Sequence, residues 1–245
     1  MTDPYTKKIK NQILAWGATL VGVADVAPLK ELQTYPPDLL GPFSSAVSVA
    51  VALPVWIFEM ISHGPTPIYK SAYETANRML DEVAFRAALL LESDGFHSLP
   101  VPASQIVDKK NLCGAITHKA VARMAGLGWQ GKNLLLITPK YGSRVRLATV
   151  LTEAPLVADR PLKNRCGECT LCRDACPVGA IKGVNTKSHY GNRDEAMCFS
   201  RCAEKLMGEF ARLPEIGTPI CGICIKVCPF GRKKGGHTKP LHTEQ

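Results

Sequence analysis

The sequence lacks any long apolar segment that could serve as a leader or a membrane anchor. Its first residues, Met-Thr-Asp-Pro-Tyr-Thr-Lys-Lys, contain no apolar stretch of the kind found in signal peptides. The longest apolar run, from about Ala46 to Phe58, is interrupted by Ser48 and Pro54 and falls short of the roughly 20 residues that cross a bilayer. We therefore expect a cytoplasmic protein with no membrane partner, and a buried strand within this run.

Acidic residues are also scarce, with 21 Asp and Glu against 30 Lys and Arg, which gives a formal charge of +9. This basic excess favours an acidic redox partner or a phosphate-bearing ligand, although it could serve solubility alone. The 245 residues, of which 46% are hydrophobic, suffice for one sizeable core and a smaller second unit.

Apolar periodicity predicts alternating helices and strands before residue 160. The strand candidates are Leu20 to Val26, Ala46 to Leu53, Phe96 to Val101, Leu134 to Thr138 and Val145 to Thr152. The helix candidates are Tyr5 to Gly17, Ser71 to Asp94 and His118 to Ala125. Pro-Lys-Tyr-Gly-Ser, between the last two strands, predicts a hairpin turn. We expect an α+β domain over residues 1–160 and a second domain over 161–245 that ends in a basic tail containing Lys233 and Lys234.

Nine of the ten cysteines lie between Cys166 and Cys228. Without a secretory signal, such crowding indicates metal binding rather than disulfides. The first motif, Cys166-x2-Cys169-x2-Cys172-x3-Cys176-Pro177, has the spacing of bacterial ferredoxins that hold [4Fe–4S] clusters. A zinc ribbon would instead show two separated cysteine pairs.

The second motif, Cys221-x2-Cys224-x3-Cys228-Pro229, is one cysteine short, because Thr218 stands where a full repeat would begin. In two-cluster ferredoxins the fourth cysteine of each motif binds the other cluster. This rule assigns one cluster to Cys166, Cys169, Cys172 and Cys228, and the other to Cys176, Cys221, Cys224 and either Cys198 or Cys202. Two such clusters lie close enough together to conduct single electrons. Cys113 and the unused cysteine would then be ordinary thiols.

The segment Gly126-Leu-Gly128-Trp-Gln-Gly131 matches G-x-G-x-x-G formally, but a helix candidate precedes it and a strand candidate follows it. A dinucleotide site needs the opposite order. The glycines would instead let the backbone approach a flat ligand or another chain segment, or form a tight turn from helix to strand.

Ala122 to Thr152 strongly resembles the matching stretch of the epoxyqueuosine reductases, and the two cysteine motifs follow in the same order as in that family. The resemblance implies a nitroreductase-like α+β domain that binds cobalamin, followed by a ferredoxin-like domain with two [4Fe–4S] clusters, as in the related reductive dehalogenases. It favours Cys198 over Cys202 as the eighth ligand. It also implies that Gly126, Gly128, Trp129, Gly131 and Lys132 lie near the corrinoid. Tyr73 is a further candidate for this pocket, or for the apolar face of its helix.

Three features depart from the family. Its catalytic Asp lies seventeen residues before the motif Trp, where this chain has Leu112, and Asp108 is nearby but out of register. Its Gly-Arg-Asp-Tyr-His segment is replaced by Ile68-Tyr-Lys-Ser-Ala-Tyr-Glu74, and its C-terminal helical repeats, which help to hold tRNA, are missing. We interpret the chain as a shortened relative whose catalytic residues are unknown.

The leading hypothesis is an iron–sulfur reductase that passes electrons through two clusters to a bound cobalamin, and from there to a small substrate or a partner's corrinoid. Its partners would be a low-potential donor of the ferredoxin or flavodoxin type and, in the second case, a corrinoid protein. One alternative is an electron-transfer module without its own catalysis. The other is an epoxyqueuosine reductase, although the missing acid and extension argue against tRNA as a partner.

Overall fold

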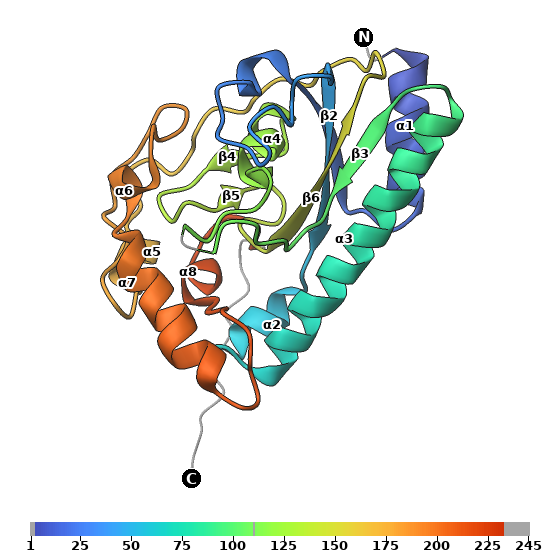
Figure 1. Cartoon of the computed structure of the whole chain (residues 1–245). Coiled ribbons are helices and arrows are strands. Elements are labelled where there is room, and N and C mark those ends of the chain that lie inside the picture. The colour runs from blue at the N-terminus through green and yellow to red at the C-terminus, as the bar shows by residue number, and fades with distance from the viewer. Residues whose placement is uncertain (1–2, 110, 233–245) are drawn as a thin grey trace.

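The computed structural model describes residues 3–109 and 111–232, and the predicted basic tail with Lys233 and Lys234 lies outside them. The strands are β1 (Leu20–Asp25), β2 (Ser45–Ala52), β3 (Ser98–Val101), β4 (Trp129–Gln130), β5 (Leu136–Ile137) and β6 (Val145–Thr152). The α-helices are α1 (Pro4–Ala15), α2 (Val55–Glu59), α3 (Pro67–Ser93), α4 (His118–Met124), α5 (Leu171–Asp174), α6 (Arg193–Ala196), α7 (Phe199–Glu204) and α8 (Ile223–Lys226). The predicted α+β class is confirmed (Figure 1).

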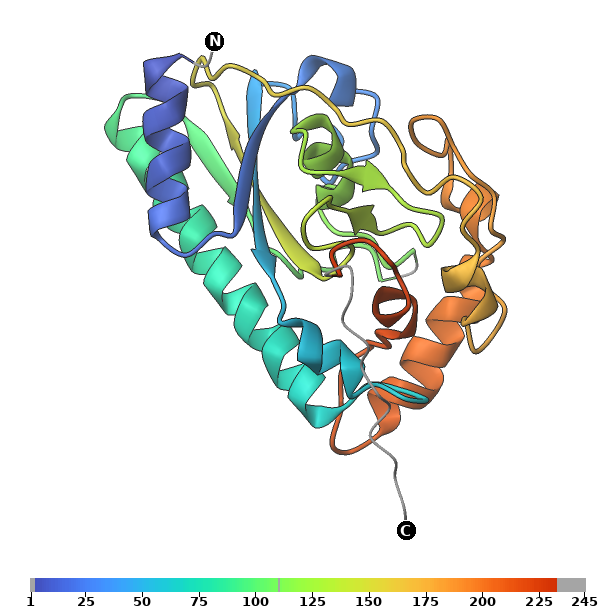
Figure 2. The same cartoon turned by 180° about the vertical axis from the view of Figure 1, so that it is seen from behind.

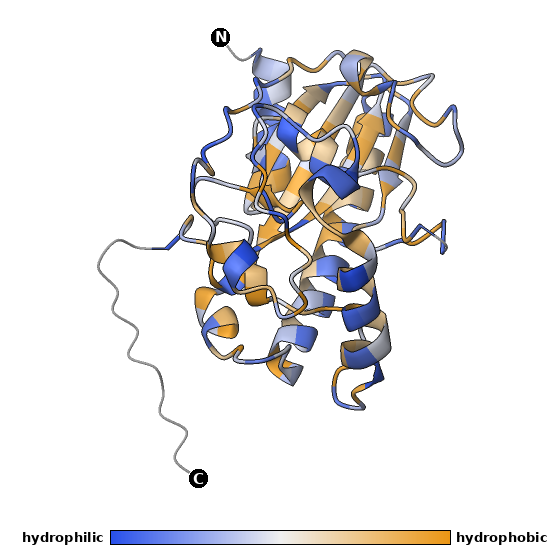
Figure 3. Cartoon of the chain, turned by 90° about the vertical axis from the view of Figure 1, so that its left-hand side faces the viewer, coloured by the Kyte–Doolittle hydropathy of each residue, from blue (hydrophilic) through white to orange (hydrophobic). Residues whose placement is uncertain are grey.

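The main sheet is antiparallel throughout and has the strand order β1-β2-β6-β3. Helices α1 and α3 pack on one face, and Figure 2 shows α3 running along the whole length of that face. The other face packs on α4 and on the loop that contains Leu29 and Leu40. Because both faces are covered, the central strand β2 is apolar along nearly its whole length and is almost entirely buried (Figure 3).

Local sequence explains the bounds of the long helix α3. The Thr66 hydroxyl accepts a hydrogen bond from the Tyr69 backbone N–H at 3.2 Å, and Pro67 occupies the first helical position. Gly95 ends the helix in a left-handed conformation with φ of 93°. The predicted helix from Ser71 to Asp94 therefore begins one turn too late.

The predicted hairpin between Leu134–Thr138 and Val145–Thr152 is wrong. Within the second of these segments, β6 pairs with β2 and β3 in the main sheet, whereas β5 pairs with β4 in a separate two-stranded sheet. The turn signal itself is correct, because Thr138 and Gly142 form an isolated bridge. The chain turns there, but it then moves from one sheet to the other.

The cysteine-rich segment packs directly on the preceding residues. Ile216, Ile220 and Ile223 share a hydrophobic core with Phe58 and Ile61, and α8 contacts α2. In Figures 1 and 2, α8 lies between the main sheet and α7. The domain boundary near residue 160 stays a prediction, and the two sides of it are joined by a common core.

The buried Arg144 forms a second connection between these parts. Its Nη1 donates to the Leu53 carbonyl and its Nη2 to the Gly231 carbonyl, both at 2.8 Å. Gly142 and Gly231 permit this contact, since a Cβ on either would lie within 2.4 Å of the opposing backbone. The segment that follows Cys228 is therefore held against the β5–β6 turn. No helix among the described residues is both long and apolar enough to cross a bilayer.

Candidate iron–sulfur site

Cys166, Cys169, Cys172 and Cys228, here called the first cysteine group, surround one small cavity of about 30 Å³. The first three come from the loop and short helix at α5, and Cys228 comes from the residues after α8. Burial, together with the neighbouring Cys166, Cys228 and Cys169, raises the pKa of the Cys172 thiol to about 11. Four thiols that face one cavity fit a single cluster, because iron–sulfur clusters are held by four cysteine thiolates.

Two side chains contact the first cysteine group from the chain around the glycine motif, Trp129 within the motif and Lys132 directly after it. Trp129 Nε1 donates to Cys166 Sγ at 3.4 Å, and Lys132 Nζ donates to the Cys169 carbonyl at 3.0 Å. The Trp129 ring also meets the edge of Phe230, with ring centroids 4.8 Å apart. The indole donor therefore faces the sulfur that would carry the charge of a bound cluster.

Ser143 provides a further polar group at this site. Its hydroxyl is buried and falls short of regular hydrogen-bond geometry within the described residues. It nevertheless lies close enough to lower the pKa of the Cys228 thiol, against the larger effect of burial, which raises that pKa. A cluster-bound thiolate on Cys228 would be a suitable acceptor for this hydroxyl.

Cys176, Cys202, Cys221 and Cys224 form the second cysteine group. Cys202 lies on α7 and Cys224 on α8, and the pKa of each thiol is raised first by burial and then by other thiols of this group. Cys224 is also within electrostatic reach of Cys172. The two groups therefore adjoin through these two residues, which suits electron transfer between clusters.

The structure places Cys202 in this group, whereas the resemblance had favoured Cys198. Cys198 precedes the first turn of α7 and lies toward the surface, where its Sγ is 3.4 Å from the Ser200 hydroxyl. That hydrogen bond is the main cause that lowers the pKa of Cys198, and no other thiol affects it. Cys202 is one helical turn later and faces inward. Burial makes Cys202 the alternative candidate for the eighth ligand, and Cys198, which the resemblance favours, stays a prediction.

The remaining thiols are consistent with ordinary cysteines. All ten cysteines of the chain are unpaired, so none of the described thiols forms a disulfide. Cys113 is exposed, and its Sγ lies 3.4 Å from the Asn111 carbonyl. Among the described residues, no three His, Cys, Asp or Glu side chains converge closely enough to hold one metal ion. The cysteine ligands of an iron–sulfur cluster bind different iron atoms, so they need not converge on one ion.

The glycine motif contacts protein rather than an open cofactor pocket. A Cβ on Gly128 would lie 2.2 Å from the Ile137 carbonyl oxygen, and one on Gly126 would lie 2.7 Å from the Arg160 carbonyl oxygen. Gly131 packs against the Ile137 side chain. With Trp129 and Lys132 turned to the first cysteine group, five of the six predicted corrinoid contacts have other neighbours. The contacts of the three glycines agree with one interpretation that the sequence left open, in which the glycines let another chain segment approach closely.

Tyr73 is the sixth predicted contact, and its surroundings are polar. Its hydroxyl lies 3.2 Å from Ser104 Oγ, and the Arg146 guanidinium lies over its ring at 4.3 Å from the centroid. Tyr69 packs edge-on against it with centroids 6.5 Å apart, and burial raises the pKa of Tyr69. Tyr69 also lies within electrostatic reach of Cys224 and Cys221, so this region borders the second cysteine group.

His118 is engaged at both ring nitrogens. Nδ1 lies 2.8 Å from the Thr149 hydroxyl, and Nε2 lies 2.9 Å from the Pro102 carbonyl. Since a carbonyl only accepts, Nε2 carries a proton. Burial lowers the pKa of His118 to about 4, so the ring is neutral near pH 7. This histidine holds the start of α4 in place and offers no free nitrogen to a metal.

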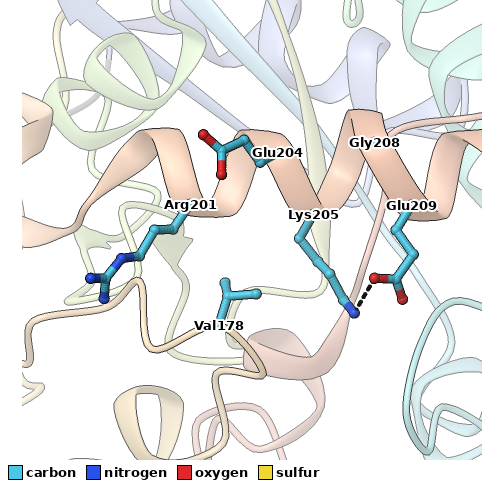
Figure 4. A pocket seen from close by; sticks show the side chains of 6 residues that line it. All are labelled: Val178, Arg201, Glu204, Lys205, Gly208 and Glu209. Carbon is cyan, nitrogen blue, oxygen red and sulfur yellow. Dashed lines mark hydrogen bonds and ion pairs between the residues drawn. The ribbon is translucent and has the colours of Figure 1, made fainter.

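A broad surface depression of about 560 Å³ lies along α7 and the residues that follow it (Figure 4). It is lined by Val178, Arg201, Glu204, Lys205, Gly208 and Glu209. Acidic and basic side chains alternate in this lining, and Lys205 pairs with Glu209 at 2.5 Å. The depression is open and internally neutralised, so it lacks the convergent polar groups of an enclosed ligand site.

Comparison with protein families places the cysteine groups in a known type of domain. Residues 165–231 match the model of a 4Fe-4S double cluster binding domain. An epoxyqueuosine reductase of Listeria monocytogenes is 31% identical over 228 residues, which are 89% of this chain and 55% of that protein. One from Bacillus subtilis is 38% identical over 132 residues, or 52% of this chain and 32% of that protein. The chain thus spans about half the length of the Listeria protein, and its match covers about a third of the Bacillus protein.

Solved structures share the fold. A catabolic reductive dehalogenase in complex with 3-bromo-4-hydroxybenzoic acid matches with a TM-score of 0.71 and 21% identity, over 92% of this chain and 31% of that one. The epoxyqueuosine reductase of Bacillus subtilis matches with a TM-score of 0.63 and 24% identity, over 96% of this chain and 68% of that one. The predicted resemblance to epoxyqueuosine reductases is confirmed, and with the family match it supports a site for two [4Fe–4S] clusters.

Sequence reasoning named seven thiols of these two groups and left Cys198 or Cys202 as the eighth ligand, with Cys198 preferred. Cys202 packs on the core formed by Ala180, Ile181 and Tyr190, and an amphipathic pattern on so short a helix as α7 is too weak to show this. Ser143 and the Trp129 indole were not expected beside the cysteines. The signal for Trp129 was present, because it is a large side chain within a stretch of glycines, but its target could not be inferred.

Proposed function

We propose that this protein is an iron–sulfur reductase that carries single electrons through two [4Fe–4S] clusters to an acceptor beside the second cysteine group. The observation that carries the proposal is the pairing of the thiols into two adjoining groups of four, which meet at Cys172 and Cys224. Clusters held in this way differ in their surroundings, and the surroundings of a cluster set its reduction potential.

The surroundings suggest a direction for the electrons. The cavity of the first group is bordered by Leu171, whose side chain is exposed, so a donor protein could approach there. The second group is bordered by Tyr69 and Lys119, which lie deeper in the protein. We propose that a low-potential donor of the ferredoxin or flavodoxin type reduces the first cluster, and that the second cluster serves the acceptor.

A corrinoid is the acceptor suggested by the relatives. One matched structure, 20% identical, is described as suggesting a mechanism for B12-dependent dehalogenation. When bound, cobalamin would supply a cobalt centre that accepts electrons and reduces a substrate. Of the residues expected to hold it, Tyr73 lies nearest to the second group, through its ring contact with Tyr69, whereas Gly126 to Lys132 contact protein or the first group. The proposed electron path therefore does not depend on a corrinoid, and the same geometry suits an electron-transfer module.

Epoxide reduction on tRNA is a second enzymatic candidate, because curated relatives carry the name epoxyqueuosine reductase and one matched structure holds an epoxyqueuosine-modified tRNA stem loop. The position of the family's acid is Leu112, whose side chain cannot donate a proton. Asp108 lies nearby, and its carboxylate accepts hydrogen bonds from the Asn111 backbone and side chain. We rank this activity below the first proposal.

One anaerobic experiment separates these functions. The protein is purified without oxygen, its iron and sulfide are measured, and its spectrum is followed during reduction with and without added hydroxocobalamin. Cobalamin that stays bound through gel filtration and becomes Co(I) when the clusters are reduced supports the corrinoid reductase. Cluster bleaching with no cobalamin retained supports the electron-transfer module. Turnover of an epoxyqueuosine-bearing stem loop would favour the tRNA enzyme, and a protein without iron would refute the proposal.

A further inference from the structure

Lys132 is a buried cation that lines the cavity of the first cysteine group. Only 5% of the residue is exposed, although lysine is a side chain that normally reaches water. The same cavity is lined by Cys166, Cys169, Cys172 and Cys228. Of the described residues that line it, Lys132 is the only one with a positively charged side chain. An ammonium group is therefore placed beside the four sulfurs that would hold a cluster.

The turn between β4 and β5 fixes the position from which this lysine extends. The Gly131 N–H donates to the Leu135 carbonyl at 2.8 Å, and the Leu134 N–H donates to the Gly131 carbonyl at 2.9 Å. Asn133 Oδ1 accepts a hydrogen bond from the Leu135 N–H at 3.2 Å. Because hydrogen bonds close the turn on both sides of Lys132, its side chain leaves the backbone at a defined place next to the cavity.

The ammonium group of Lys132 has one acceptor among the described residues. Its Nζ donates to the Cys169 carbonyl at 3.0 Å, and no described carboxylate forms an ion pair with it. A lysine ammonium carries three donors, so two are left for other acceptors. The acidic side chains of the cysteine loop face elsewhere, since Asp174 pairs with Arg173 and Glu168 is exposed. The described protein groups therefore orient this charge without neutralising it.

A buried cation costs free energy unless an anion lies against it. A [4Fe–4S] cluster with four thiolate ligands is an anion, and its negative charge grows by one when it is reduced. The attraction to Lys132 is therefore stronger in the reduced state. Salt weakens this attraction little, because the ammonium is shielded from water. A fixed positive charge at this place favours reduction of the first cluster.

We propose that Lys132 is the counter-ion of the first cluster and raises its reduction potential. The inference rests on the proposed function, because it needs a cluster in the first group, and it deepens that function by naming a residue that controls electron entry. No bond is made or broken at the lysine: one electron passes from a donor of the ferredoxin or flavodoxin type to the cluster. The Cys169 carbonyl holds the ammonium in place, and the charge acts on the cluster.

The test is an anaerobic redox titration of cluster-loaded wild type, Lys132→Gln and Lys132→Arg, monitored by electron paramagnetic resonance. Glutamine keeps an N–H donor for the Cys169 carbonyl but has no charge, whereas arginine keeps the charge. In Lys132→Gln the equilibrium constant for reducing the first cluster should fall by about tenfold or more, which lowers the potential by about 60 mV. Lys132→Arg should recover most of this loss. Cys166→Ser, which removes a ligand of the first group, identifies the signal of that cluster.

Lys163→Gln is the matched control, since Lys163 is an exposed lysine in the segment that leads to Cys166. Water and salt screen an exposed charge, so this variant should shift the potential little. The shift in Lys132→Gln should persist at about 1 M salt, where the screening length is only about 3 Å. Iron and sulfide content and circular dichroism, measured on every variant, show whether it is loaded and folded.

Three results would overturn the inference. The first is a first-cluster potential that Lys132→Gln leaves unchanged in folded, loaded protein, and the second is a shift that Lys132→Arg shares in full. The third is loss of the first cluster in both variants, which would show that the shape of the lysine, and not its charge, holds the cysteine loop. Loss in Lys132→Gln alone would support the inference, because arginine restores the charge. Failure of the proposed function is distinguishable, since the wild-type protein would then contain no iron.

Discussion

The two cysteine groups have the same number of thiols but different neighbours. Two neutral groups, the Trp129 indole and the Ser143 hydroxyl, face sulfurs of the first group, while the one cation that lines its cavity, Lys132, donates to a backbone carbonyl, and the group adjoins exposed Leu171. The second lies deeper and adjoins two cations, Lys119 and, beyond Tyr69, Arg146. The cysteine spacing determines what the two sites hold, and the residues before position 160 determine how the two differ.

This difference matters because the potential of a cluster follows the hydrogen bonds to its sulfurs, its burial and nearby charge. Hydrogen-bond donors and cations both favour the reduced state, which carries one more negative charge, whereas burial away from water opposes it. Removal of one cluster tests whether the two groups are separate sites. Removal of single neighbouring side chains tests how much each contributes to the difference in cluster potential.

The largest effect is expected from Cys202→Ser. If Cys202 completes the second group, the variant should lose one cluster, and its iron content should fall from about eight to about four atoms per chain. Cys198→Ser is the matched control, since it removes a thiol four residues away that faces the surface. Iron and sulfide assays, with electron paramagnetic resonance of the reduced protein, measure the outcome. Loss of the cluster in Cys198→Ser instead would restore the ligand that the family resemblance favours.

The next effect concerns His118, which holds the start of α4 on the side of the second group. Its pKa is lowered to about 4 in the folded chain, against 6.5 when unfolded. The unfolded chain therefore binds the proton first as the pH falls through 6.5, and stability declines between there and pH 4. From pH 7.5 to 5.5 this group should cost about 1.4 kcal/mol, or about 3–6 °C in melting temperature.

His118→Asn should abolish that part of the pH dependence, because the new side chain does not titrate. The measurement is the melting temperature of the two proteins at both pH values under argon. His97→Asn is the control, since it removes an imidazole that is exposed and lies outside α4. Equal acid sensitivity of wild type and His118→Asn would show that the ring is not held neutral in the folded chain.

Periodicity predicted the main sheet and its covering helices well, because β2 and α3 are long and bury regular faces. It failed where pairing depends on distant partners. Leu136–Ile137 and Val145–Thr152 look like the two arms of one hairpin, yet they enter different sheets. A turn signal shows that the chain reverses, and it does not show which strand receives each arm.

At the site, ligand spacing is a local property, so seven of the eight thiols were predictable. The choice between Cys198 and Cys202 depends on which side of α7 is buried, and this is set by packing against distant parts of the chain such as Ala180 and Ile181. The neighbours of the glycine motif depend on packing in a similar way. Its glycines do permit close approach, but the partners are Ile137 and Arg160. Sequence alone cannot tell a backbone partner from a flat cofactor.

A smaller effect is expected from Trp129→Phe, which removes the indole donor and keeps an aromatic ring against Phe230. Loss of one hydrogen bond to Cys166, worth about 1 kcal/mol, should lower the potential of the first cluster by about 40 mV. The second cluster should keep its potential, since Trp129 does not contact it. Trp56→Phe, at an exposed position of α2, is the control. Anaerobic redox titration monitored by paramagnetic resonance resolves the two clusters.

The smallest effect is expected from Ser143→Ala. In the metal-free chain the hydroxyl is buried without a regular partner, so its removal should leave stability unchanged or slightly higher. In the loaded protein it has the Cys228 thiolate to donate to, and its loss should lower the first cluster's potential by about 20–40 mV. A lower cluster potential in the loaded protein, without a loss of stability in the metal-free chain, distinguishes a side chain that serves the cluster from one that only packs within the fold. Ser48→Ala is the control, because Ser48 is equally buried and unpartnered but lies in β2, within the main sheet. If both variants changed the potential alike, the Ser143 hydroxyl would have no specific role, and the two cysteine groups would differ through Trp129 and the cations alone.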